Sequence, residues 1–97
     1  MTIPTDVLTW VAAHFRECDR ETAIALLSHA TDDFDNPVDA RLIRCATLAS
    51  AGDLDKLTNL VEELRIDWRD VIMAGEYEHQ AGELVQVRDL SRPIPDA

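Results

Sequence analysis

The chain has 97 residues, 46% of them hydrophobic, with 19 acidic and 9 basic residues and a formal net charge of −10. This length and apolar content predict a single folded domain and argue against wholesale disorder. Acidic residues exceed basic ones in every part of the chain, so the surface should repel phosphate backbones, and direct binding to DNA or RNA is disfavoured. Three glycines and four prolines favour a helical fold over a turn-rich β fold.

Two helices are predicted before residue 31, joined closely enough to form an antiparallel hairpin. The first should begin between Thr2 and Thr5, either of which can cap it, and the second should begin at Asp19. Their apolar stripes are Leu8, Val11, Phe15 and Cys18 in the first helix and Ala23, Leu26, Leu27 and Ala30 in the second. Trp10 lies off the first stripe, and we expect it either to cover the edge of the core or to be an exposed anchor for a partner.

Residues 31–37 form a loop with three carboxylates, from Asp32, Asp33 and Asp35. An EF-hand calcium loop requires a glycine at its sixth position and an acid at its twelfth, and this sequence does not have that spacing. We therefore interpret the segment as a structural loop, with Asn36 capping the third helix and Pro37 as the first helical residue. Phe34 is expected to pack onto the core.

The centre of the chain predicts two helices, at residues 41–51 and 53–66, separated by Gly52. Glycine tolerates the conformation that ends a helix, and Asp53 can cap the next one. The first apolar face is Val38, Leu42, Cys45, Ala46 and Ala49, and the second is Leu54, Leu57, Leu60, Val61 and Leu64. Leu48 lies off its stripe, which indicates a central helix or one that meets a partner chain.

A fifth helix is predicted to begin at Asp67, with Asp70 closing a capping box and Trp68 buried by the preceding helices. Gly75 should end or kink this helix. Residues 76–79 and 84–88 alternate weakly around Ala81 and Gly82, which favours either a short hairpin or a strand-like tail. Pro93 and Pro95 then exclude a helix at the C-terminal end.

Part of this region resembles a known family. The residues that carry the resemblance are Gly52-Asp53-Leu54, Leu57 and Leu60-Val61-Glu62, followed by Asp67-Trp68-Arg69-Asp70-Val71 and Glu76-Tyr77. They are similar to a family of short uncharacterised bacterial proteins with a Gly-Asp-hydrophobic helix start and an Asp-aromatic-Arg-Asp-Val segment that ends in Glu-Tyr. That family has no established activity, so the resemblance implies a bacterial fold unit and assigns no site.

Motifs for catalysis are weak in this sequence. His14 and Cys18 are one helical turn apart, but a cysteine on an apolar stripe lacks the electropositive surroundings that generate a thiolate. Two distant cysteines and three scattered histidines do not match the paired spacing of a zinc site. The glycines are isolated, so no loop that cradles phosphate is predicted. We therefore expect no catalytic, cofactor-binding or metal-binding residue.

The cellular location is inferred from the N-terminal residues and the cysteines. The start of the chain lacks the basic and then apolar segment of a signal peptide, and no apolar run approaches the ~18 residues that a membrane span needs. We expect a cytoplasmic protein that does not enter the membrane, in which the two cysteines are free and mostly buried.

Together these patterns predict an all-α fold of about five helices in antiparallel hairpins, with an extended or short β-hairpin C-terminal segment. Residues 1–90 should form a single helical domain, in which 79–90 is a hairpin or strand, and residues 91–97 should form an extended tail.

The function favoured by the acidic surface is a non-catalytic protein-interaction module that binds or inhibits a basic protein partner. The candidate partner-binding residues are Asp32, Asp33, Asp35, Trp10 and Leu48. The alternative is a homodimeric or larger scaffold component that uses Leu48, Trp10 and the C-terminal strand as its interface. An enzyme is the most remote interpretation.

Overall fold

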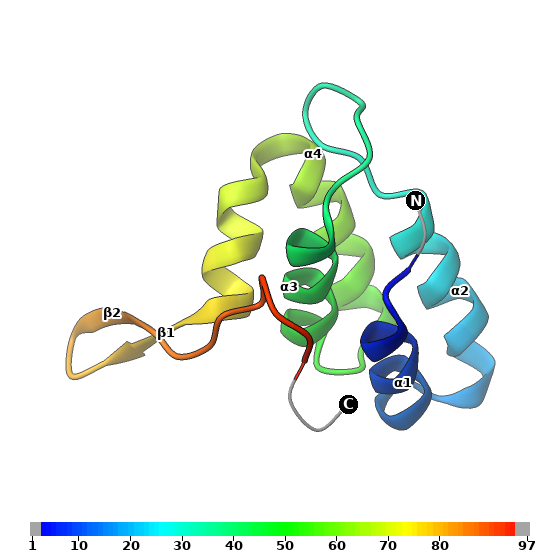
Figure 1. Ribbon diagram of the computed structural model, residues 1–97, viewed down its shortest axis with the longest axis horizontal. Helices are drawn as coiled ribbons and strands as arrows, with labels where there is room; N and C mark the ends of the chain where they lie inside the picture. The colour runs from blue at the N-terminus through cyan, green and yellow to red at the C-terminus, as the bar shows by residue number, and fades with distance from the viewer. Residues whose placement is uncertain (1–2, 95–97) are drawn as a thin grey trace.

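The computed structural model describes residues 3–94. In this range the chain forms four helices followed by a two-stranded antiparallel hairpin (Figure 1). The elements are α1 (Thr5–His14), α2 (Glu17–Ser28), α3 (Ala40–Ser50), α4 (Leu54–Glu76), β1 (Tyr77–Gln80) and β2 (Glu83–Gln86). The mostly helical architecture confirms the coarse prediction, but the described chain has four helices instead of about five.

Helices α1 and α2 adjoin each other, but their ends and faces differ from the prediction. The residues that precede them, Pro4 and Arg16, provide no side-chain cap. Thr2 lies outside the described residues. The helical run breaks at Phe15, whose backbone is extended, so Cys18 belongs to α2 and does not continue the α1 stripe. The buried positions of α1 are Val7 and Val11, whereas Leu8 and Cys18 are exposed.

Helix α3 begins at Ala40, close to the predicted range 41–51 but three residues after the predicted start at Pro37. Its cap is Asp39, whose Oδ1 accepts a hydrogen bond of 3.0 Å from the Leu42 N–H. Asn36 and Pro37 remain in the loop, where Pro37 forms an isolated β-bridge with Thr31. Phe34 is 77% exposed, so the prediction that it packs onto the core was wrong.

The turn between α3 and α4 confirms the predicted boundary. Ala51 and Gly52 both have positive φ, at 53° and 82°, and the Asp53 side chain accepts hydrogen bonds from the Asp55 and Lys56 N–H groups. A Cβ atom at Gly52 would lie 2.5 Å from the His14 carbonyl oxygen, so this glycine also allows the turn to approach α1.

Helix α4 is kinked at Asp67, where φ is −151° and ψ is 97°. The Asp67 carboxylate accepts a hydrogen bond of 3.1 Å from the Arg69 N–H, so it caps the second half as predicted. No loop separates the halves, however, and residues 54–76 form one bent helix where two were expected (Figure 1). Asp70 lies beside Glu63 and does not close a capping box: a side-chain hydrogen bond between them raises the pKa of Glu63.

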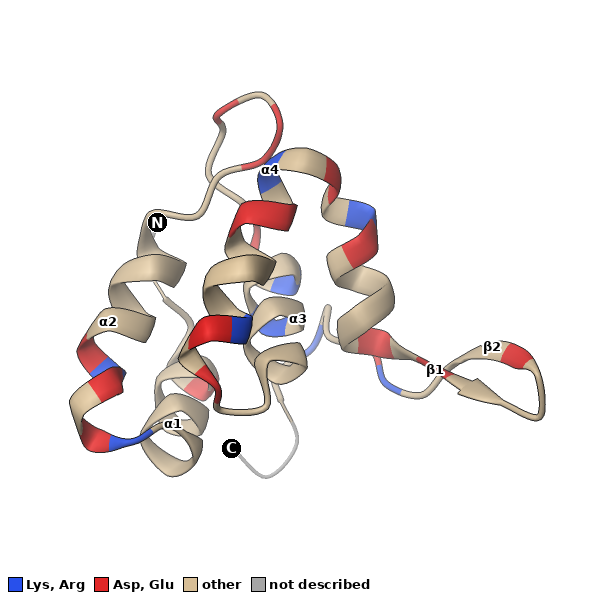
Figure 2. Cartoon of the chain, turned by 180° about the vertical axis from the view of Figure 1, so that it is seen from behind, with Lys and Arg blue, Asp and Glu red and all other residues tan. Residues whose placement is uncertain are grey.

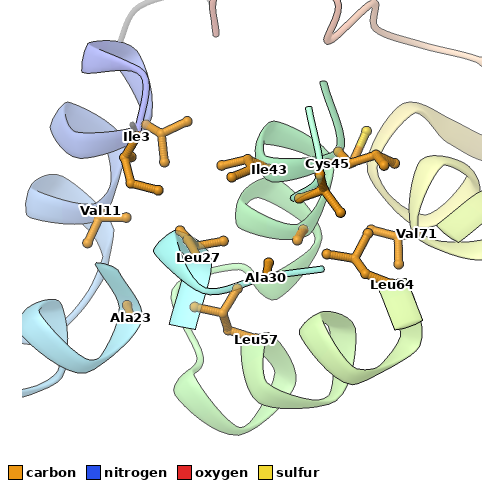
Figure 3. Close-up of a cluster of buried hydrophobic side chains, with 14 of the residues drawn as sticks. Ile3, Val11, Ala23, Leu27, Ala30, Ile43, Cys45, Leu57, Leu64 and Val71 are labelled. Carbon is orange, nitrogen blue, oxygen red and sulfur yellow. The ribbon is translucent and has the colours of Figure 1, made fainter. Parts of the chain in front are cut away.

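The core surrounds α3, which packs along both halves of α4 and also contacts α1 (Figure 3). Ile43 and Cys45 of α3 and Leu57, Leu64 and Val71 of α4 are fully buried. Gly75 lies against Cys45: a Cβ atom there would lie 2.6 Å from the Cys45 Cα atom. The two helices therefore touch at backbone distance near the end of α4.

The hairpin that follows α4 confirms one of the two C-terminal alternatives. The strands pair from Tyr77 with Gln86 to Gln80 with Glu83, and the turn residues Ala81 and Gly82 both have positive φ. This pair of positive φ values is the hairpin geometry of a type I′ turn. The hairpin projects away from the helices (Figure 1).

The chain returns to the helices after the hairpin. Leu90 is fully buried and Ile94 is 7% exposed, and the Ile94 N–H donates to the Asp6 Oδ2 atom at 2.9 Å. Pro95, Asp96 and Ala97 lie outside the described residues. Within the part of the chain that the structure describes, no helix is both long and apolar enough to cross a lipid bilayer.

Candidate partner-binding groove

The acidic loop, residues 31–37, has a defined conformation that turns Phe34 outward. The Asp32 Oδ1 atom accepts hydrogen bonds from the Phe34 N–H at 2.8 Å and from the Asn36 N–H at 3.0 Å. The Asp32 N–H donates to the Asn36 carbonyl oxygen at 2.9 Å, and Asp35 adopts a φ of 60°. An aspartate that bonds its own downstream backbone in this way stabilises a turn. The side chain of Phe34 is therefore exposed by the fold of the loop.

A groove of about 520 Å³ separates this loop from the second half of α4. We call it the aromatic–acidic groove, and its lining residues are Asp32, Asp33, Phe34, Pro37, Val38, Asp39, Arg41, Leu42, Trp68 and Ile72. Trp68 is 38% exposed, which corrects the prediction that the preceding helices bury it. Both large aromatic side chains of the groove therefore remain accessible to a ligand.

The charge of the groove is negative at its rim. Asp32, Asp33 and Asp39 contribute carboxylates, and Arg41 is the one basic residue in the lining. A smaller hollow of about 350 Å³ adjoins the groove and adds Asp35, Glu62, Arg65 and Ile66 to its surroundings. Figure 2 shows the acidic residues on this loop and on the neighbouring part of α4. Arg65 reaches Asp35 only at 3.7 Å, and both side chains are mostly exposed, so this pair screens little of the negative charge.

Arg41 is held by Glu76 and is not free to neutralise the rim. Its Nε and Nη2 atoms donate to the two carboxylate oxygens of Glu76 at 2.7 and 2.8 Å. The Glu76 carboxylate also accepts from the Gln86 side-chain amide at 2.8 Å and from the Leu90 N–H at 3.3 Å. The hydrogen bond from Arg41 lowers the pKa of Glu76 despite burial, and the same pair raises the pKa of Arg41. This buried cluster fixes the start of α3 against the end of α4.

The structure brings only some of the predicted partner-binding residues together. Asp32 and Asp33 line the groove, and Asp35 lies in the adjoining hollow. Trp10 is in α1, at the opposite end of the molecule from the acidic loop (Figure 1), where its ring stacks on His14 with centroids 4.0 Å apart. Leu48 is half-buried and packs against the core. The combination of Trp10, Leu48 and the acidic loop in one contact surface is therefore not formed.

Sequence reasoning missed Phe34 and Trp68 as surface residues. The prediction places Phe34 on the core as part of a structural loop, and it buries Trp68 because Trp68, Val71 and Ile72 recur at helical spacing. For Phe34 a signal was available: it is surrounded by aspartates and by residues that favour turns. For Trp68 the spacing alone was misleading, because its side chain lines the groove and is 38% exposed.

Other reactive side chains do not converge. His14 Nδ1 lies 3.0 Å from the Trp10 carbonyl oxygen, and no hydrogen bond joins it to Cys18 among the described residues. Cys18 Sγ is instead within 3.8 Å of Asp19 Oδ1. Within residues 3–94, no three His, Cys, Asp or Glu side chains are grouped closely enough to hold a metal ion.

No family model, no curated protein and no solved structure matches this chain. The choice of a function therefore depends on the chemistry of the groove.

Proposed function

We propose that the protein is a non-catalytic interaction module that binds a basic segment of a partner protein in the aromatic–acidic groove. The observation that carries the proposal is the combination, in one hollow, of two accessible aromatic side chains with three carboxylates at the rim. Aromatic side chains in a hollow are frequent anchors of protein–protein contacts. The carboxylates favour a partner of positive charge and repel one of negative charge.

The overall charge supports the same kind of partner. A net charge of −10 on 97 residues produces a long-range attraction for basic proteins. The two arginines of α3 do not reduce this attraction near the groove, because Arg41 is paired with Glu76 and Arg44 with Asp6. Binding of such a partner should weaken as the salt concentration rises.

The test uses the full chain as bait in lysate of its host at low salt, followed by elution at rising salt. The double variant Asp32→Lys with Asp33→Lys should lose a basic protein that the wild type retains. The matched control is Glu17→Lys with Glu21→Lys, which changes the net charge equally at exposed positions of α2. Circular dichroism checks that both variants are folded. Retention of the same protein by the Asp32 and Asp33 variant would exclude the groove as the contact.

The hairpin supports a second candidate, self-association. Strands β1 and β2 form a two-stranded sheet that stands away from the helices, so the outer edges of both strands lack a neighbour within the described chain. Such an edge can pair with a strand of a second copy. Trp10 and Leu48 add little exposed area to this contact because both are half-buried. Sedimentation equilibrium that shows only monomer at high micromolar concentration would eliminate this candidate.

A further inference from the structure

We propose that the aromatic–acidic groove selects arginine over lysine in its partner, with the guanidinium group against Trp68 and Phe34 and paired with Asp33. This inference rests on the proposed interaction function and adds the side chain that is recognised. Phe34 is 77% exposed and Trp68 is 38% exposed, and both line the same groove. An aromatic face attracts a cation that stacks on it, and arginine stacks more often than lysine.

The carboxylates of the groove are positioned and available. Asp33 has no hydrogen-bond or ion-pair partner among residues 3–94, so both of its oxygens can accept. Asp32 uses its Oδ1 atom to hold the Phe34 and Asn36 N–H groups, which fixes its carboxylate relative to the Phe34 backbone. The two oxygens of the free Asp33 carboxylate suit the planar fork of a guanidinium group, which donates two parallel hydrogen bonds to one carboxylate.

The nearby cations of the protein do not occupy this position. Arg41 is bound through two hydrogen bonds to the buried Glu76 carboxylate. Arg69 donates to both carboxylate oxygens of Asp67, with a shortest distance of 3.0 Å. Arg41, the one arginine of the lining, therefore already has a partner. Arg69 lies outside the lining, and its pKa is raised mainly by its hydrogen bond with Asp67 and less by the charge of Asp33.

The chemistry of the groove distinguishes the two basic side chains. The lysine ammonium group is compact and strongly hydrated, so it gains less from stacking and cannot form the two-pronged pair. The groove of about 520 Å³ is also larger than one side chain, so it admits the flanking residues of a peptide. A peptide with several arginines is consequently the appropriate probe.

The experiment is a titration of the 15N-labelled full chain with three hexapeptides followed by NMR. The peptides are acetyl-Gly-Arg-Gly-Arg-Gly-Arg-amide, its lysine counterpart and its citrulline counterpart, which keeps the shape without the charge. We expect the arginine peptide to shift the Trp68 indole and the Phe34 and Asp33 amide signals, with an affinity at least about threefold above that of lysine. Trp68→Leu and Asp33→Asn should each lower the affinity for the arginine peptide by about tenfold.

Controls separate this inference from the proposed function. Asp55→Asn removes one exposed carboxylate at the start of α4, outside the groove, and should leave the affinity for the arginine peptide unchanged. Equal binding of the arginine and lysine peptides in the groove would overturn arginine selection and leave the proposed function intact. Absence of any shift at the groove with either charged peptide would overturn both.

Discussion

Glu76 is a fully buried acid whose carboxylate contacts three separate segments. It accepts hydrogen bonds from Arg41 of α3, from Gln86 of β2 and from the Leu90 N–H beyond the hairpin. A buried carboxylate with this many donors is stable only while its donors remain in place, because an unpaired charge in the interior is costly. Glu76 therefore links α3, β2 and the segment that follows the hairpin.

Replacing Glu76 by Gln should lower the free energy of unfolding by about 2 kcal/mol, because the charge-assisted hydrogen bonds from Arg41 are weakened, while the 38% exposed Arg41 side chain stays partly hydrated. Urea denaturation followed by circular dichroism measures the change. The control is Glu78→Gln. In the ion pair between Glu78 and Arg88 both side chains are exposed, so this substitution should change the free energy of unfolding by less than about 1 kcal/mol. Equal effects of the two substitutions would show that burial does not strengthen the Glu76 pair.

Low pH should destabilise the wild-type protein because it protonates the Glu76 carboxylate. The pKa of Glu76 lies below the ordinary value of 4.5, so the folded state binds its proton less readily than the unfolded state. The stabilisation is complete above pH 4.5 and is lost as the pH falls through the lowered pKa of the folded protein. Melting temperatures measured from pH 6 to pH 3 should therefore fall more steeply for the wild type than for Glu76→Gln. Parallel curves would contradict this assignment.

The two cysteines should react at different rates. Burial, together with the neighbouring Glu76 charge, raises the pKa of Cys45 to about 12, so its thiolate is scarce at neutral pH. Cys18 is exposed. Iodoacetamide at pH 8 should modify one thiol per native chain and both after denaturation, as counted by mass spectrometry. In Cys18→Ser the native protein should remain unmodified, and rapid labelling there would show that Cys45 is accessible.

At the residue scale, the sequence predicted local roles better than long-range ones. Asp53 and Asp67 were identified as helix caps because a cap depends on the next few residues. The role of Glu76 was not predicted, because its partners are up to 35 residues away along the chain. Asp32 and Asp33 of the groove can be predicted as binding residues from their charge alone. The exposure of Phe34 and Trp68 is known only from the folded structure.

At the scale of elements, the backbones of α3 and α4 come close together at Gly75. A Cβ atom there would lie 2.6 to 2.9 Å from the Cα, Cβ and carbonyl oxygen atoms of Cys45. Two of these atoms belong to the backbone and cannot rotate away. The helices would have to separate to admit a methyl group.

Gly75→Ala should therefore lower the free energy of unfolding by about 2 kcal/mol, although alanine favours an isolated helix. Thermal and urea denaturation provide the measurement. The control Ala74→Gly, at an exposed neighbouring position, should cost about 1 kcal/mol through helix propensity alone. An increase in stability for Gly75→Ala would show that the two helices can move apart easily.

The elements themselves were largely predictable from the sequence. The turn at Gly52 and the hairpin turn at Gly82 follow from glycines, which tolerate the positive φ that both positions adopt. The number of helices was wrong because a capped start at Asp67 normally implies a preceding loop, whereas here the helix only bends. The start of α3 was wrong because Asp39 competes with Asn36 as a cap and forms the observed bond.

At the scale of the whole molecule, the C-terminal segment completes the hydrophobic core. Leu90 is as fully buried as Leu57 of α4. Arg44 donates to Asp6 at 2.9 Å and to the Leu90 carbonyl oxygen at 3.4 Å, which ties this segment to α1 and α3. Burial raises the pKa of Asp6, but hydrogen bonds from Arg44 and Ile94 outweigh it and lower that pKa overall.

Leu90→Ala should consequently lower the free energy of unfolding by about 3 kcal/mol, similar to Leu57→Ala. The comparison is made by urea denaturation at neutral pH. Leu84→Ala in the hairpin is the control, because Leu84 is 40% exposed, and its cost should stay below about 1 kcal/mol. A small effect at Leu90 together with a large one at Leu57 would mean that the C-terminal segment is dispensable for folding.

The hydrogen bond between Asp6 and Ile94 joins positions 88 residues apart, and it has a consequence for synthesis on the ribosome. Helices α1 to α4 can form while the chain is still emerging, but the hydrogen bonds of Asp6, Arg44 and Glu76 are incomplete until Leu90 and Ile94 have left the exit tunnel. Until then, the charged groups that are buried in the folded protein remain exposed to water in the nascent chain. Its final cooperative folding step should therefore wait until residues 90–94 have emerged, and a chain interrupted before residue 90 should be an easy substrate for proteases.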